Sequence, residues 1–266
     1  MHMLKIRSTA VLVALSISLG GLVAPANAAV VLLSESRNVY ASALVNTAIG
    51  SESASSSRNS LGDFSDFDKS VAVGANLGES SASASAEQTS QISATSISAT
   101  GMAAANAEIN PFDPSFFASA NASANTSLFV SFELTSPQLF DLSGTLSSDA
   151  DLFGFAQADV SLTSQDGSFS LLLSAPFPGG QTTPFDLSGT LFPNVYTLTA
   201  NANIGADAFF DTDPVGGASE FSFDLEFLPD PLRYLAIVPV PLPAAFWLFA
   251  AGLIGLAGIA RAGKTA

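Results

Sequence analysis

The chain has no cysteine and one histidine, His2, among its 266 residues. Disulfides and thiolate nucleophiles are therefore excluded, and so are zinc sites built from several histidines. Basic side chains are also scarce, because eight Lys and Arg stand against 23 Asp and Glu, which gives a net charge of −15. Phosphate backbones repel such a chain, and we expect no nucleic-acid partner. Since 48% of the residues are hydrophobic and only 12% are charged, the chain is too apolar to be disordered throughout.

Residues 1–28 have the pattern of a secretory signal helix. Lys5 and Arg7 precede an uncharged run with an apolar centre, and the run closes on small residues at Ala26 and Ala28. This pattern predicts export and cleavage by signal peptidase after Ala28. The alternative is a retained N-terminal anchor. Cleavage would also remove the single histidine, the best proton shuttle at neutral pH.

A second apolar segment lies near the other end. No charge occurs from Leu235 to Ala260, and Arg261 and Lys264 follow directly. A helix over 243–260 has about 18 residues and a length of roughly 27 Å, enough to cross a bilayer core. We expect one transmembrane helix there, with the two bases as its cytoplasmic stop signal.

The residues around the start of this helix form a recognisable motif. They read Val240-Pro241-Leu242-Pro243-Ala244. With the glycine-spaced helix and the basic end that follow, residues 237–266 resemble the PEP-CTERM sorting tail in its VPLPA-CTERM variant. The resemblance implies processing by an exosortase, a membrane-embedded cysteine transpeptidase. It also implies a Gram-negative surface or matrix protein that accompanies exopolysaccharide production. A plain single-span anchor with a proline-rich hinge is the alternative.

Between the two ends, residues 29–236 hold all 23 acids and four bases, a net charge of −19. Apolar and polar residues alternate there with a period of two, which predicts β-strands. We therefore expect an all-β ectodomain, an antiparallel β-sandwich of jelly-roll-like form, between the signal helix and the transmembrane helix. The runs that carry this pattern are 39–45, 71–77, 118–134, 159–163, 169–173, 196–206 and 221–227.

Three further segments refine the expected sandwich. The heptapeptide FDLSGTL occurs at 140–146 and at 185–191, and we expect each copy to be a strand with a glycine-containing bend, placed similarly in two halves of the sandwich. Residues 51–107 are rich in Ser and Ala, for which strands are favoured over a flexible linker, with 63–69 as an exposed loop. Glycines and a proline at 214–217 indicate a turn.

Carboxylates are the only plentiful reactive groups of the ectodomain. Asp149 with Asp151, and Asp211 with Asp213, have short spacings that could bind a calcium ion, although neither pair completes an EF-hand loop. Solvated acidic turns are the alternative. No other cofactor is expected.

The sequence predicts an exported, non-catalytic surface or matrix protein, sorted by an exosortase-like enzyme. A calcium-dependent carbohydrate-binding module that engages exopolysaccharide is the alternative. A carboxylate-based glycoside hydrolase is a third hypothesis, because two acids about 5–10 Å apart would suffice for that chemistry.

Overall fold

The structure is a computed structural model that describes residues 30–109, 118–175, 180, 182–209 and 214–228. All regular elements of these residues are β-strands, arranged as two six-stranded antiparallel sheets. The predicted all-β sandwich is therefore confirmed. The helices predicted for 1–28 and 243–260 lie outside the described residues. Within the described residues, no helix has the length and apolarity to cross a membrane.

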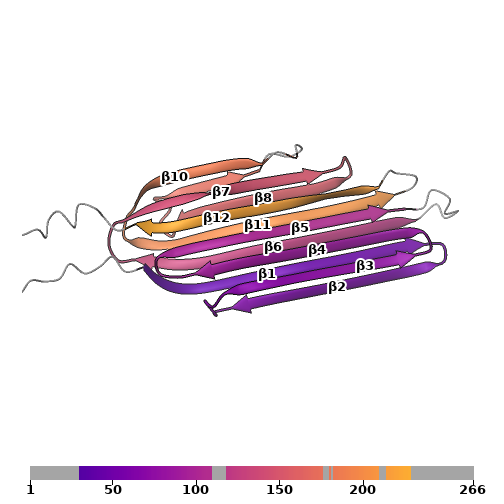
Figure 1. Ribbon diagram of the computed structural model, residues 1–266, viewed down its shortest axis with the longest axis horizontal. Coiled ribbons are helices and arrows are strands. Elements are labelled where there is room, and N and C mark those ends of the chain that lie inside the picture. Colours follow the sequence, from indigo (N-terminus) through magenta and orange to yellow (C-terminus); the bar gives the residue numbers. More distant parts are fainter. Residues whose placement is uncertain (1–29, 110–117, 176–179, 181, 210–213, 229–266) are drawn as a thin grey trace, which may run out of the picture.

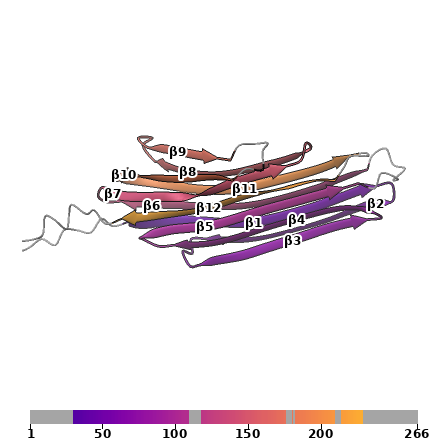
Figure 2. The ribbon, with the colours of Figure 1, turned by 45° about the horizontal axis from the view of Figure 1, so that its top comes forward.

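The twelve strands run close to the long axis of the molecule (Figures 1 and 2). Their bounds are β1 Val30–Thr47, β2 Gly50–Leu61, β3 Phe67–Leu77, β4 Ser80–Ile92, β5 Ser96–Glu108, β6 Ser119–Leu134, β7 Gln138–Ala150, β8 Gly154–Ser164, β9 Ser170–Ser174, β10 Thr183–Leu191, β11 Asn194–Phe209 and β12 Val215–Leu228. Sheet A has the order β2-β1-β6-β11-β8-β9, and sheet B has the order β10-β7-β12-β5-β4-β3. Because neighbours in each sheet are often distant in sequence, the chain crosses repeatedly between the two sheets.

The Ser/Ala-rich stretch is folded into β2, β3, β4 and most of β5. Alternate residues of β4 and β5, most of them alanines, are buried against sheet A, so the strand interpretation is confirmed. The predicted loop at 63–69 is wrong in part. β3 already begins at Phe67, whose side chain is only 3% exposed. The loop ends early because the Phe67 ring packs beneath the Arg37 guanidinium, 5.1 Å from the ring centre.

The two FDLSGTL copies lie side by side, which corrects the prediction of separate halves. They form β7 and β10, paired antiparallel about Leu142 and Leu187. This register sets Phe140 opposite Gly189 and Phe185 opposite Gly144. The glycines make no bend. A Cβ on Gly189 would lie 3.1 Å from the Phe140 ring, so this glycine leaves room for the phenylalanine of the other copy. A Cβ on Gly144 would lie 2.1 Å from the Ser222 carbonyl oxygen of β12 and 2.7 Å from the Phe185 ring, so this glycine leaves room for both.

The turn predicted at 214–217 is also wrong, because β12 begins at Val215. Gly216 and Gly217 lie inside the strand, between β5 and β7. A Cβ on Gly217 would lie 2.2 Å from the carbonyl oxygen of Asp149, so these glycines permit a close approach of neighbouring backbones rather than a reversal of the chain.

The core between the sheets differs at its two ends. At one end, near the β1–β2 and β3–β4 turns, buried alanines line both sheets; we call this the alanine half. At the other end aromatic rings meet across the sheets, with Phe132 5.2 Å from Phe227 and 5.7 Å from Tyr196 between ring centres; we call this the aromatic half. The alanine half is lined by Ala43, Ala82, Ala84, Ala105, Ala107, Ala120, Ala122, Ala206 and Ala208.

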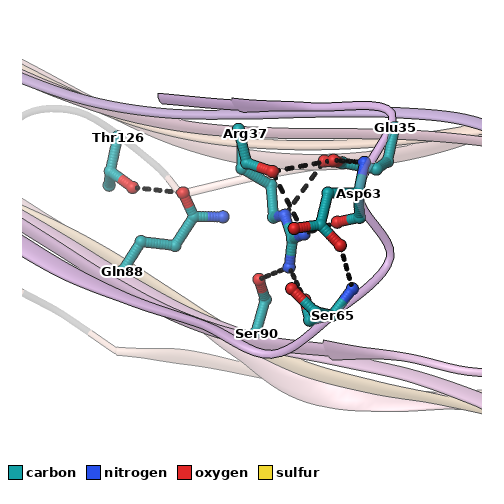
Figure 3. A network of polar contacts seen from close by, with 8 residues as sticks. Glu35, Arg37, Asp63, Ser65, Gln88, Ser90 and Thr126 are labelled. Carbon is teal, nitrogen blue, oxygen red and sulfur yellow. Dashed lines mark hydrogen bonds and ion pairs between the residues drawn. The ribbon is translucent and has the colours of Figure 1, made fainter. Parts of the chain in front are cut away.

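A buried ion pair lies on the β1 side of the aromatic half (Figure 3). The Arg37 and Glu35 side chains are 1% and 0% exposed, and the Arg37 Nε donates to Glu35 Oε2 at 2.9 Å. The Arg37 guanidinium also donates to the carbonyl oxygens of Ser65 and Asp63, and Glu35 Oε1 accepts from the Asp63 backbone N–H at 2.8 Å and from the Ser60 hydroxyl at 2.9 Å. This network ties the β2–β3 loop to the core, and sequence patterning did not reveal it.

Candidate functional site on the polar face of sheet A

The outer surface of sheet A carries a broad array of hydroxyl and amide side chains, which we call the polar face. Its strands present alternate residues outward, while the residues between them are buried. The polar face comprises Asn38, Tyr40, Ser42, Leu44 and Asn46 of β1, Ser51, Ser53, Ser55, Ser57 and Asn59 of β2, Ser119, Asn121, Ser123, Asn125 and Ser127 of β6, Phe155, Gln157, Asp159 and Ser161 of β8, and Thr199, Asn201, Asn203, Gly205 and Asp207 of β11.

Hydrogen bonds between neighbouring strands hold many of these side chains in place. The bonds join Ser42 Oγ and Ser123 Oγ (2.8 Å), Asn121 Nδ2 and Asp207 Oδ1 (2.6 Å), Asn201 Nδ2 and Asp159 Oδ2 (3.1 Å), and Ser161 Oγ and Thr199 Oγ1 (2.6 Å). The two carboxylates each accept an amide N–H, so their charge is partly compensated at the surface. The array is thus pre-ordered before any ligand arrives.

Two hollows on the described surface have volumes of ≈ 360 and ≈ 610 Å³. The larger of these two lies on the polar face. Its floor is open at Gly205, since a Cβ built there would have no heavy atom within 4 Å. Only one of its lining residues, Asp207, is ionisable. The polar lining residues are Ser42, Ser53, Ser55, Asn121, Ser123 and Asp207.

Aromatic rings flank this hollow. Phe155 is the partner of Gly205 in the neighbouring strand and is 49% exposed. Tyr40, which is 38% exposed, lies two residues from Ser42 on β1. Hydroxyls and amides that both donate and accept hydrogen bonds, next to exposed ring faces, suit an uncharged polyhydroxylated ligand. A phosphate ligand would need the lysines and arginines that this hollow lacks.

The outer surface of sheet B has a different character, because acids gather on it. The register places Ser143 between Asp186 and Asp224 of the flanking strands, and places Asp141 beside Glu226. One carboxylate oxygen of Asp141 and one of Asp224 are buried without a hydrogen-bond partner among the described residues. The acids are therefore not confined to loops, and the sheet brings four of them to neighbouring positions.

The structure describes one of the two proposed calcium pairs. Asp149 is near the end of β7 and Asp151 follows that strand, and both line a second hollow of ≈ 360 Å³. The Asp151 carboxylate accepts the Gly216 N–H at 2.9 Å. Two carboxylates fall short of the six to eight oxygen ligands that calcium takes, and the described residues contain no group of three or more acids with metal-binding geometry. Asp211 and Asp213 lie outside the described residues.

Two other acids have lowered pKa values, and both shape turns. The backbone N–H and hydroxyl of Ser168, with the Ser164 hydroxyl, hold the pKa of Asp166 far below its usual range. Hydrogen bonds from Ser65, with the Arg37 charge, lower the pKa of Asp63. These carboxylates stabilise the β8–β9 and β2–β3 connections.

Burial in the aromatic half raises the pKa of Tyr196, whose hydroxyl donates to the Phe192 carbonyl oxygen at 2.8 Å. The phenol thus satisfies its polar atom within the fold and fixes the chain before β11. It is not available to a ligand.

The sorting motif 240–244, the stop signal at Arg261 and Lys264, and the cleavage residues Ala26 and Ala28 lie outside the described residues. The alternating run at 118–134 predicts a strand, but no site is predicted for the Ser and Asn residues on its polar side. The signal was their nearly uncharged composition within a strongly acidic chain. The sequence alone does not give the strand pairing that brings β1, β2, β6 and β11 together in the polar face.

Comparisons with known proteins give little further information. No family model matches the chain, and no curated protein matches it. Among solved structures, it is similar to the enzymatically active domain of bacteriophage CBA120 tailspike protein 4 (TM-score 0.25, 15% identity, 55% of this chain and 19% of that one). It is also similar to TmCBM61 in complex with β-1,4-galactotriose (TM-score 0.25, 10% identity, 48% of this chain and 82% of that one). Likenesses of this size do not indicate a function.

Proposed function

We propose that the protein is an exported, non-catalytic surface or matrix protein that an exosortase-like enzyme sorts through the tail at 237–266. The motif at 240–244, set between an acidic body and an apolar segment with a basic end, is the observation that carries the proposal. Prolines restrict the residues that precede them to extended conformations. The motif would therefore be presented as an extended strand at the membrane surface, in a form that a membrane protease can bind.

The body supports a binding role rather than a catalytic one. No cysteine occurs in the chain, and its single histidine falls in the predicted signal helix. The described residues instead present a pre-ordered polar surface over a core formed by the alternate, buried residues of the strands. A protein of this kind contributes surface area, charge and contacts to an extracellular layer.

Variants of the motif test the sorting proposal. In a Gram-negative host with an exosortase-like enzyme, P241A/P243A should leave the protein at full length in the inner membrane, while wild type reaches the surface or medium in shortened form. P239A, just outside the motif, is the matched control and should be processed normally. Equal processing of all three proteins, or full-length wild type in the membrane fraction alone, would overturn the proposal.

A second candidate function, carbohydrate binding, is favoured by the hollow on the polar face. Its nearly uncharged hydroxyl and amide lining and the exposed Phe155 suit a neutral glycan. N121A and F155A should each weaken binding by about tenfold, equivalent to about 1.4 kcal/mol. T145A, on the outer surface of sheet B, is the control and should bind as wild type. A glycan array with no signal for wild type would remove this candidate.

The same array should be run with Ca²⁺ and with EDTA. Calcium dependence would implicate the Asp149 and Asp151 pair, since a cation could bridge these acids to an anionic polymer. Binding that persists in EDTA would assign recognition to the polar face alone.

A further inference from the structure

The sandwich has four edge strands, and they differ in how well they are protected against pairing with another chain. Sheet A ends at β2 and β9, and sheet B ends at β3 and β10. An edge strand exposes a row of unpaired backbone N–H and C=O groups, which are a template for another strand. Short strands, prolines and lysines that point toward the core are the usual protections.

Three of the four edges carry such a protection. β9 has only five residues. β10 contains Pro184, which cannot donate a backbone hydrogen bond. β3 carries Lys69 on the core side of the strand, between Phe67 and Val71, where a second strand would bury its charge.

β2 is protected by charge alone. It has twelve residues, contains neither proline nor lysine, and pairs with β1 in continuous register from Gly50 to Leu61. It forms the lower margin of the molecule in Figure 1. Its only charged residues are Glu52 and Arg58, both exposed. The register sets them opposite the buried Val45 and Val39 of β1, so their side chains lie on the core side of the strand, as Lys69 does in β3. The Arg58 guanidinium donates to the neighbouring Ser57 carbonyl oxygen, and no ion pair of either residue occurs among the described residues.

These two charges make the strand complementary to itself. Glu52 and Arg58 are each three residues from Ser55. When two copies of β2 pair antiparallel about a two-fold axis at Ser55, each Glu52 lies opposite the partner's Arg58 on the same side of the sheet. The residues between them are serines and one alanine, which pair without steric conflict. A charged edge that would reject an arbitrary strand thus accepts its own copy.

We propose that two copies of this protein associate through β2, by antiparallel pairing centred on Ser55. The two copies of sheet A then form one continuous sheet, and their polar faces lie on the same side of it. Ser53 and Ser55 line the hollow of each copy, so two hollows flank the axis. This inference goes beyond the proposed function and needs neither sorting nor a glycan.

The absence of native cysteine permits a direct test with the purified full chain. Paired residues in antiparallel strands have Cα atoms about 4.5–5.5 Å apart, within the range of a disulfide. S55C should therefore form a disulfide-linked dimer under mild oxidation. In S51C the two cysteines would be eight residues apart along the strand direction, roughly 27 Å, and should not react. S51C/N59C should crosslink again, since those positions pair in this register.

Charge reversal tests the register independently. E52K should raise the dissociation constant of the dimer at least tenfold, because it sets Lys opposite Arg58, and E52K/R58E should restore it. E226K, on β12, is the control for charge and should behave as wild type. Circular dichroism establishes that each variant is folded. A folded S55C that crosslinks no more than S51C would overturn the proposal. Folded wild-type protein that sediments as a monomer at 100 μM would also overturn it, because a dimer with a dissociation constant of about 1 μM is mostly formed at that concentration.

Discussion

The alanine half and the aromatic half of the core fill the same sandwich in opposite ways. Along β6 the buried residues change from Ala120, Ala122 and Ala124 to Val130 and Phe132. In the alanine half small side chains fill the space between the sheets. In the aromatic half stacked and edge-on rings fill it. The same alternating pattern therefore produces two different packing regimes.

The comparison shows where each half is vulnerable. Large side chains in the aromatic half leave a cavity when they are shortened, and the ion pair there leaves an unpaired charge when one partner is removed. The alanine half has little volume to lose but no room to gain. We therefore expect a loss of side-chain volume to destabilise the aromatic half and a gain of side-chain volume to destabilise the alanine half.

The largest effect is expected at Arg37. R37L would leave the Glu35 carboxylate buried without its cation and should lower the free energy of unfolding by about 3–5 kcal/mol. E35L/R37L should recover most of this loss because no buried charge remains. Urea denaturation of both variants measures the difference. A double variant as unstable as R37L would contradict the explanation by an unpaired charge.

Shortening a ring in the aromatic half should cost nearly as much. F132A removes the ring that contacts both Tyr196 and Phe227 and should destabilise the protein by about 3–5 kcal/mol. F129A, the neighbouring position on the outer surface of β6, is the matched control and should cost far less. Equal losses at the two positions would mean that the aromatic half is not the packed core.

In the alanine half the damaging change is a gain of side-chain volume rather than a loss. A122L adds volume to a site packed with small side chains and should destabilise the protein by about 1–3 kcal/mol. Residue 122 is buried between Ala43 and Ala206 of the flanking strands. S123L, on the polar face next to it, is the control. If A122L were neutral or stabilising in urea, the sheets would be farther apart than the alanines indicate.

The smallest effect concerns pH. The pKa values of Asp63 and Asp166 are lowered in the folded protein, so the stability that they contribute is present above the unfolded pKa of about 3.9 and is lost as the pH falls through the folded values. Acid should therefore loosen these two connections, both in the aromatic half, before it affects the alanine half. Amide exchange at Ser65 and Ser168 from pH 5 to pH 2 measures this loss. D166N should show little further change at Ser168 over that range.

Much of the fold could be predicted from the sequence because period-two alternation directly reflects burial. The strands around 118–134, 196–206 and 221–227 are examples. The heptapeptide and the glycines at 216 and 217 misled the prediction, because a glycine in a turn and a glycine beneath a neighbouring ring look alike in sequence. Only the pairing of β7 with β10 and β12 distinguishes them.

The candidate site was less predictable. The polar face depends on five strands that are far apart in sequence, and no short motif marks it. Arg37 and Glu35 gave no signal either, since charged residues in a strand usually face water. Their burial follows from the β2–β3 loop, which supplies the hydrogen bonds that they need.

The most direct test of the proposed function is the intact mass of the protein recovered from the surface or medium of a host with an exosortase-like enzyme. We predict a chain that begins at Ala29 and ends within 238–243, clearly shorter than the 27.1 kDa of the whole sequence. Recovery of the whole tail through Ala266 on the exported protein would contradict the account of sorting.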